Sequence, residues 1–133
     1  MLKKTLIAAF VAFGLPAAAQ SVSDVQFEAG NYGTMIGGTV VGNQFADYRL
    51  GAKAGQEMFV QMISVTSDGT GAVYFNILPP GSEGEAIYNS SVDGDTATVP
   101  LPSDGTYTIR VYLMGADADE GKATSFNIDL SIQ

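Results

Sequence analysis

Apolar and polar residues alternate along most of the chain beyond residue 20. The C-terminal stretch shows this most clearly, because Phe126, Ile128, Leu130 and Ile132 alternate with polar residues. A period of two is typical of a β-strand with one face in a core and the other in water. The pattern predicts eight or nine strands, over residues 24–29, 34–41, 44–52, 57–64, 72–78, 85–90, 95–100, 106–113 and 123–132.

Turn-forming residues separate these strands at short, fairly even spacing. Asp68-Gly69 and Asp104-Gly105 tolerate the positive φ of a tight hairpin, and Pro79-Pro80-Gly81 marks a loop. Many short strands joined in this way predict an all-β fold, an antiparallel β-sandwich of the jelly-roll kind. Residues 114–121 are too long for a tight turn and lack strand formers. We therefore expect one helical turn there, from Ala116 to Glu120, on a protruding loop.

The first residues have the three parts of a secretory signal. Lys3 and Lys4 are followed by an apolar run over residues 5–15, and Ala17-Ala18-Ala19 offers small residues at a cleavage site. The apolar run is too short for a membrane span, which needs about 20 residues. The sequence predicts a cleaved signal peptide over residues 1–19, one β-sandwich domain over residues 20–133, and export to the periplasm or beyond.

Charge narrows the choice of partner. The chain has 6 basic and 14 acidic residues, and removing Lys3 and Lys4 leaves 4 − 14 = −10. Such a charge repels nucleic-acid phosphates and anionic lipid and attracts cationic partners. The same charge is also explained by solubility alone. We expect a cationic protein partner, and neither nucleic acid nor a membrane span.

The amino-acid inventory lacks the side chains on which most enzymes depend. The chain contains no histidine, which is the usual general base at neutral pH and the commonest metal ligand. It also contains no cysteine, so a thiolate nucleophile and thiolate metal sites are excluded. We therefore predict a binding protein that is not an enzyme, with no cofactor, no catalytic residue and no metal site.

Paired carboxylates are the chemistry that remains. Glycoside hydrolysis needs two acids across a cleft, and the same acids could bind calcium through hard oxygen ligands. Every candidate lies in a predicted turn, where turn formation and solvation also explain it. A hydrolase and a calcium site remain rival hypotheses. The candidate acids are Glu83 with Glu85, Asp93 with Asp95, and Asp117 with Asp119 and Glu120.

The order of motifs over residues 24–132 resembles a known family. The motifs include Gly37-Gly38-Thr39-Val40-Val41-Gly42, then Asp47-Tyr48-Arg49-Leu50, and finally the run from Leu101 to Val111. This order resembles the periplasmic proteinaceous inhibitors of g-type lysozyme and, more broadly, the pre-peptidase C-terminal domain. The first resemblance implies a β-sandwich that blocks the cleft of a glycan hydrolase with a protruding loop. The second implies a free-standing accessory module that binds glycan or calcium.

The inhibitor resemblance also implies contact residues. A Ser-Gly-x-Tyr motif marks the inserted loop of the family, and this chain has Asp104, Gly105, Thr106 and Tyr107 there, with Ser103 just before. Tyr48 matches a tyrosine on another family loop. Family arginines after Leu113 correspond to Gly115 and Asp119, and a carboxylate there would be repelled by an acidic cleft. The hypothesis is that the 103–107 turn and the 114–121 loop meet one cationic lysozyme, helped by the net charge of −10. The predicted partner-binding residues are Tyr48, Ser103, Asp104, Gly105, Tyr107, Gly115 and Asp119.

Plainer explanations exist for several of these residues. Asp104-Gly105 is also an ordinary hairpin turn, and Tyr107 begins a strand and could simply pack in the core. Arg110 shares a strand face with Tyr112 and Met114 by alternation, where it is either a solvated surface residue or an anchor for a partner carboxylate.

Overall fold

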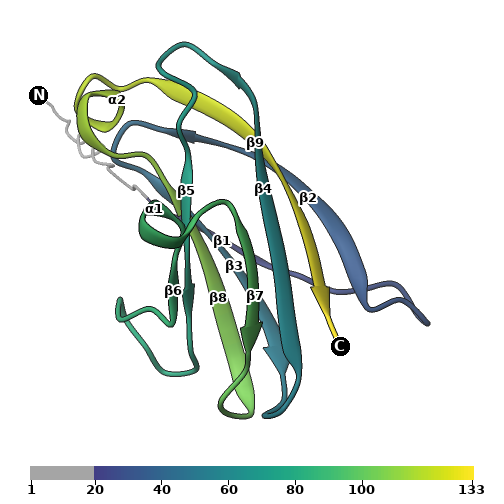
Figure 1. Cartoon of the computed structure of the whole chain (residues 1–133). Helices are drawn as coiled ribbons and strands as arrows, with labels where there is room; N and C mark the ends of the chain where they lie inside the picture. Colours follow the sequence, from purple (N-terminus) through teal and green to yellow (C-terminus); the bar gives the residue numbers. More distant parts are fainter. Residues whose placement is uncertain (1–19) are drawn as a thin grey trace, which may run out of the picture.

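A computed structural model describes residues 20–133, which form two β-sheets packed face to face (Figure 1). The predicted signal peptide, residues 1–19, lies outside the described residues. One sheet has the strand order β1-β3-β8-β5-β6 and the other β2-β9-β4-β7. The strands are β1 (Gln20–Asp24), β2 (Gly33–Val41), β3 (Phe45–Ala52), β4 (Glu57–Ser67), β5 (Tyr74–Leu78), β6 (Tyr88–Asn89), β7 (Thr96–Pro100), β8 (Gly105–Tyr112) and β9 (Ala123–Ile132).

The predicted alternation produces the core between the two sheets. Tyr107 and Ile109 on β8 and Phe126 and Ile128 on β9 have at most 1% of their surface exposed. Each of these strands turns its intervening residues outward, as its burial pattern shows. Burying a large apolar side chain stabilises the fold by roughly 2 kcal/mol, so alternation over several strands suffices to drive the sheets together. The predicted all-β sandwich is confirmed.

The N-terminal strand differs from the prediction in place and direction. The prediction put it at residues 24–29, but β1 spans Gln20–Asp24 and pairs in parallel with β3. All other strand pairs within residues 20–133 are antiparallel. Val25 and Phe27 are partly buried and pack against the core beyond the end of β1, where the Val25 N–H still donates to the Arg49 carbonyl oxygen at 2.8 Å. Their alternation therefore reports burial against the core, which continues after β1 has ended.

Two short helices interrupt the strands. Helix α1 (Ser90–Asp93) was not predicted, and it shortens the expected 85–90 strand to the two residues of β6. The buried Ser90 hydroxyl accepts a hydrogen bond from the Phe75 N–H at 2.8 Å, which ties α1 to β5. Helix α2 (Gly115–Asp119) confirms the helical turn expected on the loop after Leu113. No helix within residues 20–133 is long and apolar enough to cross a membrane.

Strand β8 fixes the positions of the two candidate loops. It starts beside the β7–β8 connection and runs to the segment that contains α2, so the two loops lie at opposite ends of the sandwich (Figure 1). The loop between β5 and β6 and the turn between β3 and β4 lie toward the same end as the β7–β8 connection.

Candidate binding end of the sandwich

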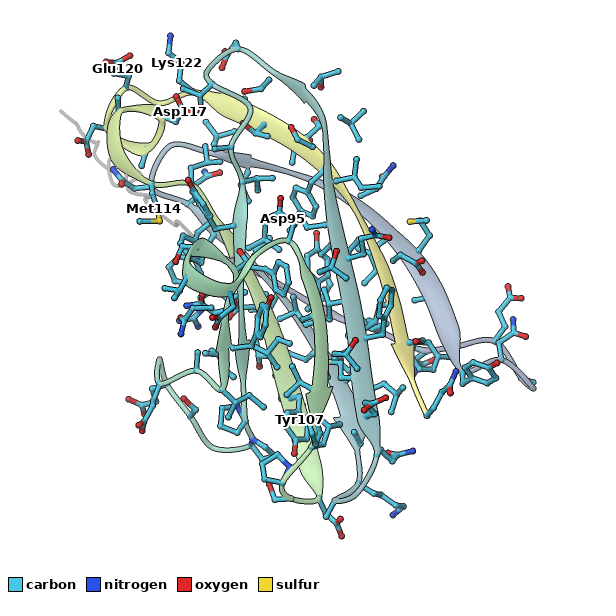
Figure 2. All side chains as sticks on the ribbon, viewed as in Figure 1. Asp95, Tyr107, Met114, Asp117, Glu120 and Lys122 are labelled. Carbon is cyan, nitrogen blue, oxygen red and sulfur yellow. The ribbon has the colours of Figure 1, made fainter. Side chains whose placement is uncertain are left out.

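The seven predicted contact residues do not form one surface. Ser103, Asp104 and Gly105 lie at the start of β8, whereas Gly115 and Asp119 lie on α2 beyond its other end. At about 3.3 Å per residue, eight strand residues separate the two groups by roughly 26 Å. Figure 2 shows the labelled Tyr107 and Met114 toward opposite ends of the sandwich. The two loops therefore form no continuous surface, and the hypothesis that both meet one lysozyme stays a prediction.

Tyr48 and Tyr107 lie inside the protein. Tyr48 is on β3, not on a loop, and only 8% of its surface is exposed. Its ring packs edge-on against Phe126, and a Cβ built on Gly38 would overlap its hydroxyl. Burial raises the pKa of the Tyr48 phenol. Tyr107 is completely buried. Neither ring is available to a partner in this structure, and the plainer explanation of Tyr107 as a core residue is confirmed.

Tyr107 nevertheless orders the turn that precedes it, residues 102–105, which we call the tip. Its hydroxyl donates a hydrogen bond to the Ser103 carbonyl oxygen at 2.6 Å and accepts one from the Ser103 N–H at 3.1 Å. A phenol can both donate and accept, so one side chain satisfies both backbone groups of the residue. Ser103 itself is exposed. The buried ring thus holds an exposed residue in one position.

Asp104 ties the tip to the neighbouring turn. Its Oδ1 accepts a hydrogen bond from the Ala54 N–H at 2.8 Å, and Ala54 belongs to the turn between β3 and β4. Backbone bonds reinforce this link, because Leu101 donates to Gln56 and accepts from Gly55. The carboxylate remains exposed while it makes this bond. Asp104 therefore both fixes the tip and gives it a negative charge.

A glycine is required at position 105 for two reasons, the backbone conformation and the close approach of Pro80. Its φ is +139°, a value that L-residues with a side chain rarely adopt. A Cβ at this position would also lie 2.8 Å from Cβ and Cγ of Pro80. The loop between β5 and β6 thus packs directly against the tip. An open depression beside it is lined by residues 51–53, Gln56 and residues 104–106.

The opposite end is held together by a buried aspartate. Asp117 on α2 is 6% exposed, and its Oδ2 accepts hydrogen bonds from the Thr70 hydroxyl at 2.7 Å and the Thr70 N–H at 3.1 Å. Its Oδ1 lies close enough to Gly69 that a Cβ there would clash with it. The carboxylate joins α2 to the β4–β5 loop. Asp117 thus has a structural role in the acidic run that suggested a calcium loop, and Gly115 and Asp119 beside it are exposed.

The partner of Arg110 was missed by sequence reasoning. Arg110 is bound by Asp47, which accepts from its Nε at 2.8 Å and its Nη2 at 2.9 Å. Asp47 is 4% exposed, and the guanidinium lies 4.4 Å from the ring centroid of Phe45. These hydrogen bonds raise the pKa of Arg110. Arg110 therefore has an internal carboxylate as its partner. Asp47 and Arg110 are directly opposite each other on β3 and β8. The pair could have been found only from the register of these two strands.

Two further candidate acids, Asp93 and Asp95, lie near Tyr88. Asp93 and Asp95 flank Gly94, whose carbonyl oxygen accepts a hydrogen bond from the Tyr88 hydroxyl at 2.7 Å. Desolvation and then the two negative charges raise the pKa of Tyr88. Within residues 20–133, no group of three or more acidic, histidine or cysteine side chains is placed to hold a metal ion. The acids near Tyr88 thus border a turn.

Comparison with known proteins supplies relatives over nearly the whole chain, although no protein-family model matches it. The inhibitor of g-type lysozyme from Escherichia coli K12 is 27% identical over 131 residues, which cover 98% of this chain and 95% of the inhibitor. The crystal structure of the periplasmic inhibitor of g-type lysozyme from Aeromonas hydrophila matches with a TM-score of 0.76 and 34% identity. That match covers 86% of this chain and 97% of the Aeromonas chain.

A more distant likeness concerns the fold alone. The pre-peptidase C-terminal domain of a collagenase from Bacillus anthracis matches with a TM-score of 0.57 at 11% identity, over 86% of this chain and 96% of that domain. Both families that the motif order resembles thus recur among the similar structures, with the lysozyme inhibitor of Aeromonas far more similar in sequence.

Proposed function

Because this chain belongs to the family of periplasmic inhibitors of g-type lysozyme, we propose that it inhibits a g-type lysozyme by inserting the tip, residues 102–105, into the active-site cleft. The chain is a binding protein of the periplasm and not an enzyme. Inhibition of this kind needs a rigid protrusion and no catalytic group, which suits a chain without histidine or cysteine.

The double hydrogen bond between Tyr107 and Ser103 is the observation that carries the proposal. A loop that is already ordered before binding loses little conformational entropy when it enters a cleft. The tip is ordered from beneath by Tyr107 and from the side by Asp104, while Ser103 and Asp104 stay exposed. This combination of an exposed residue and a fixed backbone is what an inhibitory loop requires.

In this proposal the α2 end lies outside the contact. Helix α2 lies roughly 26 Å from the tip along β8. Asp119 is therefore a surface residue far from the proposed contact, and the family's basic side chains at its position are not needed for insertion of the tip. The proposal thus places the Asp119 carboxylate away from the acidic catalytic groups of the cleft.

An inhibition assay with a substitution at each end tests the proposal. The protein purified from the periplasm is titrated against g-type, c-type and i-type lysozymes acting on cell-wall substrate. We expect inhibition of a g-type enzyme, and we expect Ser103→Trp to weaken it by about 100-fold because the larger side chain prevents insertion. Asp119→Trp is the matched control and leaves inhibition unchanged.

The outcome separates the proposal from its rivals. Loss of inhibition on Asp119→Trp together with full activity of Ser103→Trp would show that the α2 end is the inhibitory end. Failure of the unmodified protein to inhibit any g-type lysozyme at low salt would contradict the proposal outright. Circular dichroism and the melting temperature of both variants verify that the fold is intact.

A further inference from the structure

The loop between β5 and β6, residues 79–87, lies against the tip. Gly105 has no side chain where Pro80 approaches it, and a Cβ there would be 2.8 Å from two carbon atoms of the Pro80 ring. Contact this close means that the loop and the tip present one continuous surface. Whatever cleft receives the tip therefore brings its rim toward residues 79–87.

The loop is ordered by its own hydrogen bonds. The Ser82 hydroxyl donates to the Glu85 carbonyl oxygen at 2.6 Å and accepts from the Gly84 N–H at 3.2 Å. The Ser82 N–H donates to the Pro79 carbonyl oxygen at 3.1 Å, which closes a turn. These bonds limit the positions that the loop can take, so its side chains are displayed from a defined backbone.

Arg110 attaches the loop to the sheet. Its Nη1 donates to the Glu83 carbonyl oxygen at 3.4 Å, a long bond, while its other nitrogens are held by Asp47. The guanidinium is fixed further by its position over the Phe45 ring. Because Asp47 and Phe45 fix the arginine, the arginine in turn restrains the middle of the loop. Arg110 is a positioning residue for the loop and does not need to touch a partner.

The loop carries unpaired negative charge. Glu83 and Glu85 are exposed, and neither forms a salt bridge with any residue in the range 20–133. The tip adds Asp104, and the β3–β4 turn beside it adds Lys53, so the three connections together carry 1 − 3 = −2. An ordered acidic surface beside an inserted loop complements basic side chains on the partner.

We propose that residues 79–87 form a second contact arm of the inhibitory end, in which Glu83 and Glu85 bind basic side chains on the rim of the lysozyme cleft. This inference rests on the proposed function of the tip. The tip then blocks the cleft, and the 79–87 loop selects lysozymes whose rim is cationic. Charge complementarity outside the cleft chiefly speeds association and gives specificity, and it weakens as salt screens it.

Charge removal at matched positions tests the second arm. The inhibition constant of Glu83→Gln/Glu85→Gln is measured against the g-type lysozyme at about 20 mM and about 300 mM salt, where screening lengths differ several-fold. We expect inhibition to weaken by about 5- to 10-fold at low salt and by less than about 2-fold at high salt. Asp119→Asn/Glu120→Gln removes the same charge at the α2 end and serves as the control, with an expected change below about 2-fold.

Three results would overturn the second arm. Equal weakening by both double variants would assign the effect to net charge. No weakening by the loop variant, with the unmodified protein still inhibiting, would remove the loop from the contact and leave the tip proposal intact. An unmodified protein that inhibits no g-type lysozyme would remove both proposals. A loop variant that is weaker at low salt, beside an unchanged control, supports the second arm.

Discussion

At the two ends of β8, an aspartate joins neighbouring connections in different ways. At the tip, Asp104 accepts a single hydrogen bond, from the Ala54 N–H, and stays exposed. At the α2 end, Asp117 accepts bonds from the N–H and the hydroxyl of Thr70 and is buried. The same residue type thus stabilises a surface that remains free to bind at one end and is buried in a structural joint at the other.

This contrast shows how to separate binding from stability in the protein. A buried carboxylate whose hydrogen bonds are all internal contributes to stability, and its loss leaves its donors without partners. An exposed carboxylate with one internal bond contributes less to stability, and its charge remains available to a partner. Substitutions at the α2 end should therefore change stability alone, whereas substitutions at the tip should change inhibition.

The largest effect on stability is expected from Asp117→Ala. Removing the carboxylate leaves the Thr70 N–H without its acceptor and opens space beside Gly69. The free energy of unfolding should fall by about 3 kcal/mol, since a charged hydrogen-bond partner is lost from a buried site. Chemical denaturation measures this. Asp119→Ala, an exposed position on the same helix, should change it by less than about 0.5 kcal/mol. Weaker inhibition by Asp117→Ala below its melting temperature would contradict the separation of the two ends.

Gly105→Ala should affect both properties. The new methyl group must avoid Pro80 and adopt an unfavourable φ, so we expect a loss of about 2 kcal/mol and a displaced tip. Gly115→Ala is the matched change at the α2 end. Its φ is also positive, but no atom lies within 4 Å of the added Cβ, so about 1 kcal/mol should be lost. Only Gly105→Ala should weaken inhibition. Equal inhibition by the two variants, measured below both melting temperatures, would remove the tip from the contact.

Tyr107→Phe should loosen the tip at a small cost in stability. It keeps the buried ring and removes the hydroxyl that bonds to both backbone groups of Ser103. We expect a loss of about 1 kcal/mol together with weaker inhibition. Tyr112→Phe on the same strand loses a bond to Asn76 and should cost a similar amount. Inhibition by Tyr112→Phe should stay unchanged, and a parallel decrease in both variants would mean that general stability governs inhibition.

The smallest effect on stability is expected from Asp104→Asn. The amide oxygen can still accept the Ala54 N–H, so the free energy of unfolding should change by less than about 0.5 kcal/mol. Only the charge at the tip is lost. Because the catalytic cleft of a glycan hydrolase contains carboxylates, inhibition should strengthen by about 2- to 5-fold. Weaker inhibition by this variant would indicate a basic group at the bottom of the cleft. If Asp104→Asn strengthens inhibition while Glu83→Gln/Glu85→Gln weakens it, the tip faces acidic groups in the cleft and the 79–87 loop faces basic groups on its rim.

Much of the fold, and less of the site, could be predicted from the sequence. The alternation of Phe126 to Ile132 and of Tyr107 to Leu113 predicted two central strands, and the composition of residues 114–121 predicted α2. The strand expected at residues 24–29 was wrong, because the alternation of Val25 and Phe27 reflects partial burial beyond the end of β1. Helix α1 was missed, since its four residues are too few for a helical period to be visible.

What the sequence determined by itself is local, and what the tertiary structure decided depends on pairs far apart in the chain. Alternation and turn residues act over a few neighbours, and they determined the strands and the tip. The composition excluded histidine and cysteine chemistry. The joints at Asp104, Asp117 and Asp47 link residues 50, 47 and 63 positions apart. Only the packing and register of the strands bring such residues together, so only the folded protein shows that Tyr48 is buried and that the two predicted loops lie at opposite ends.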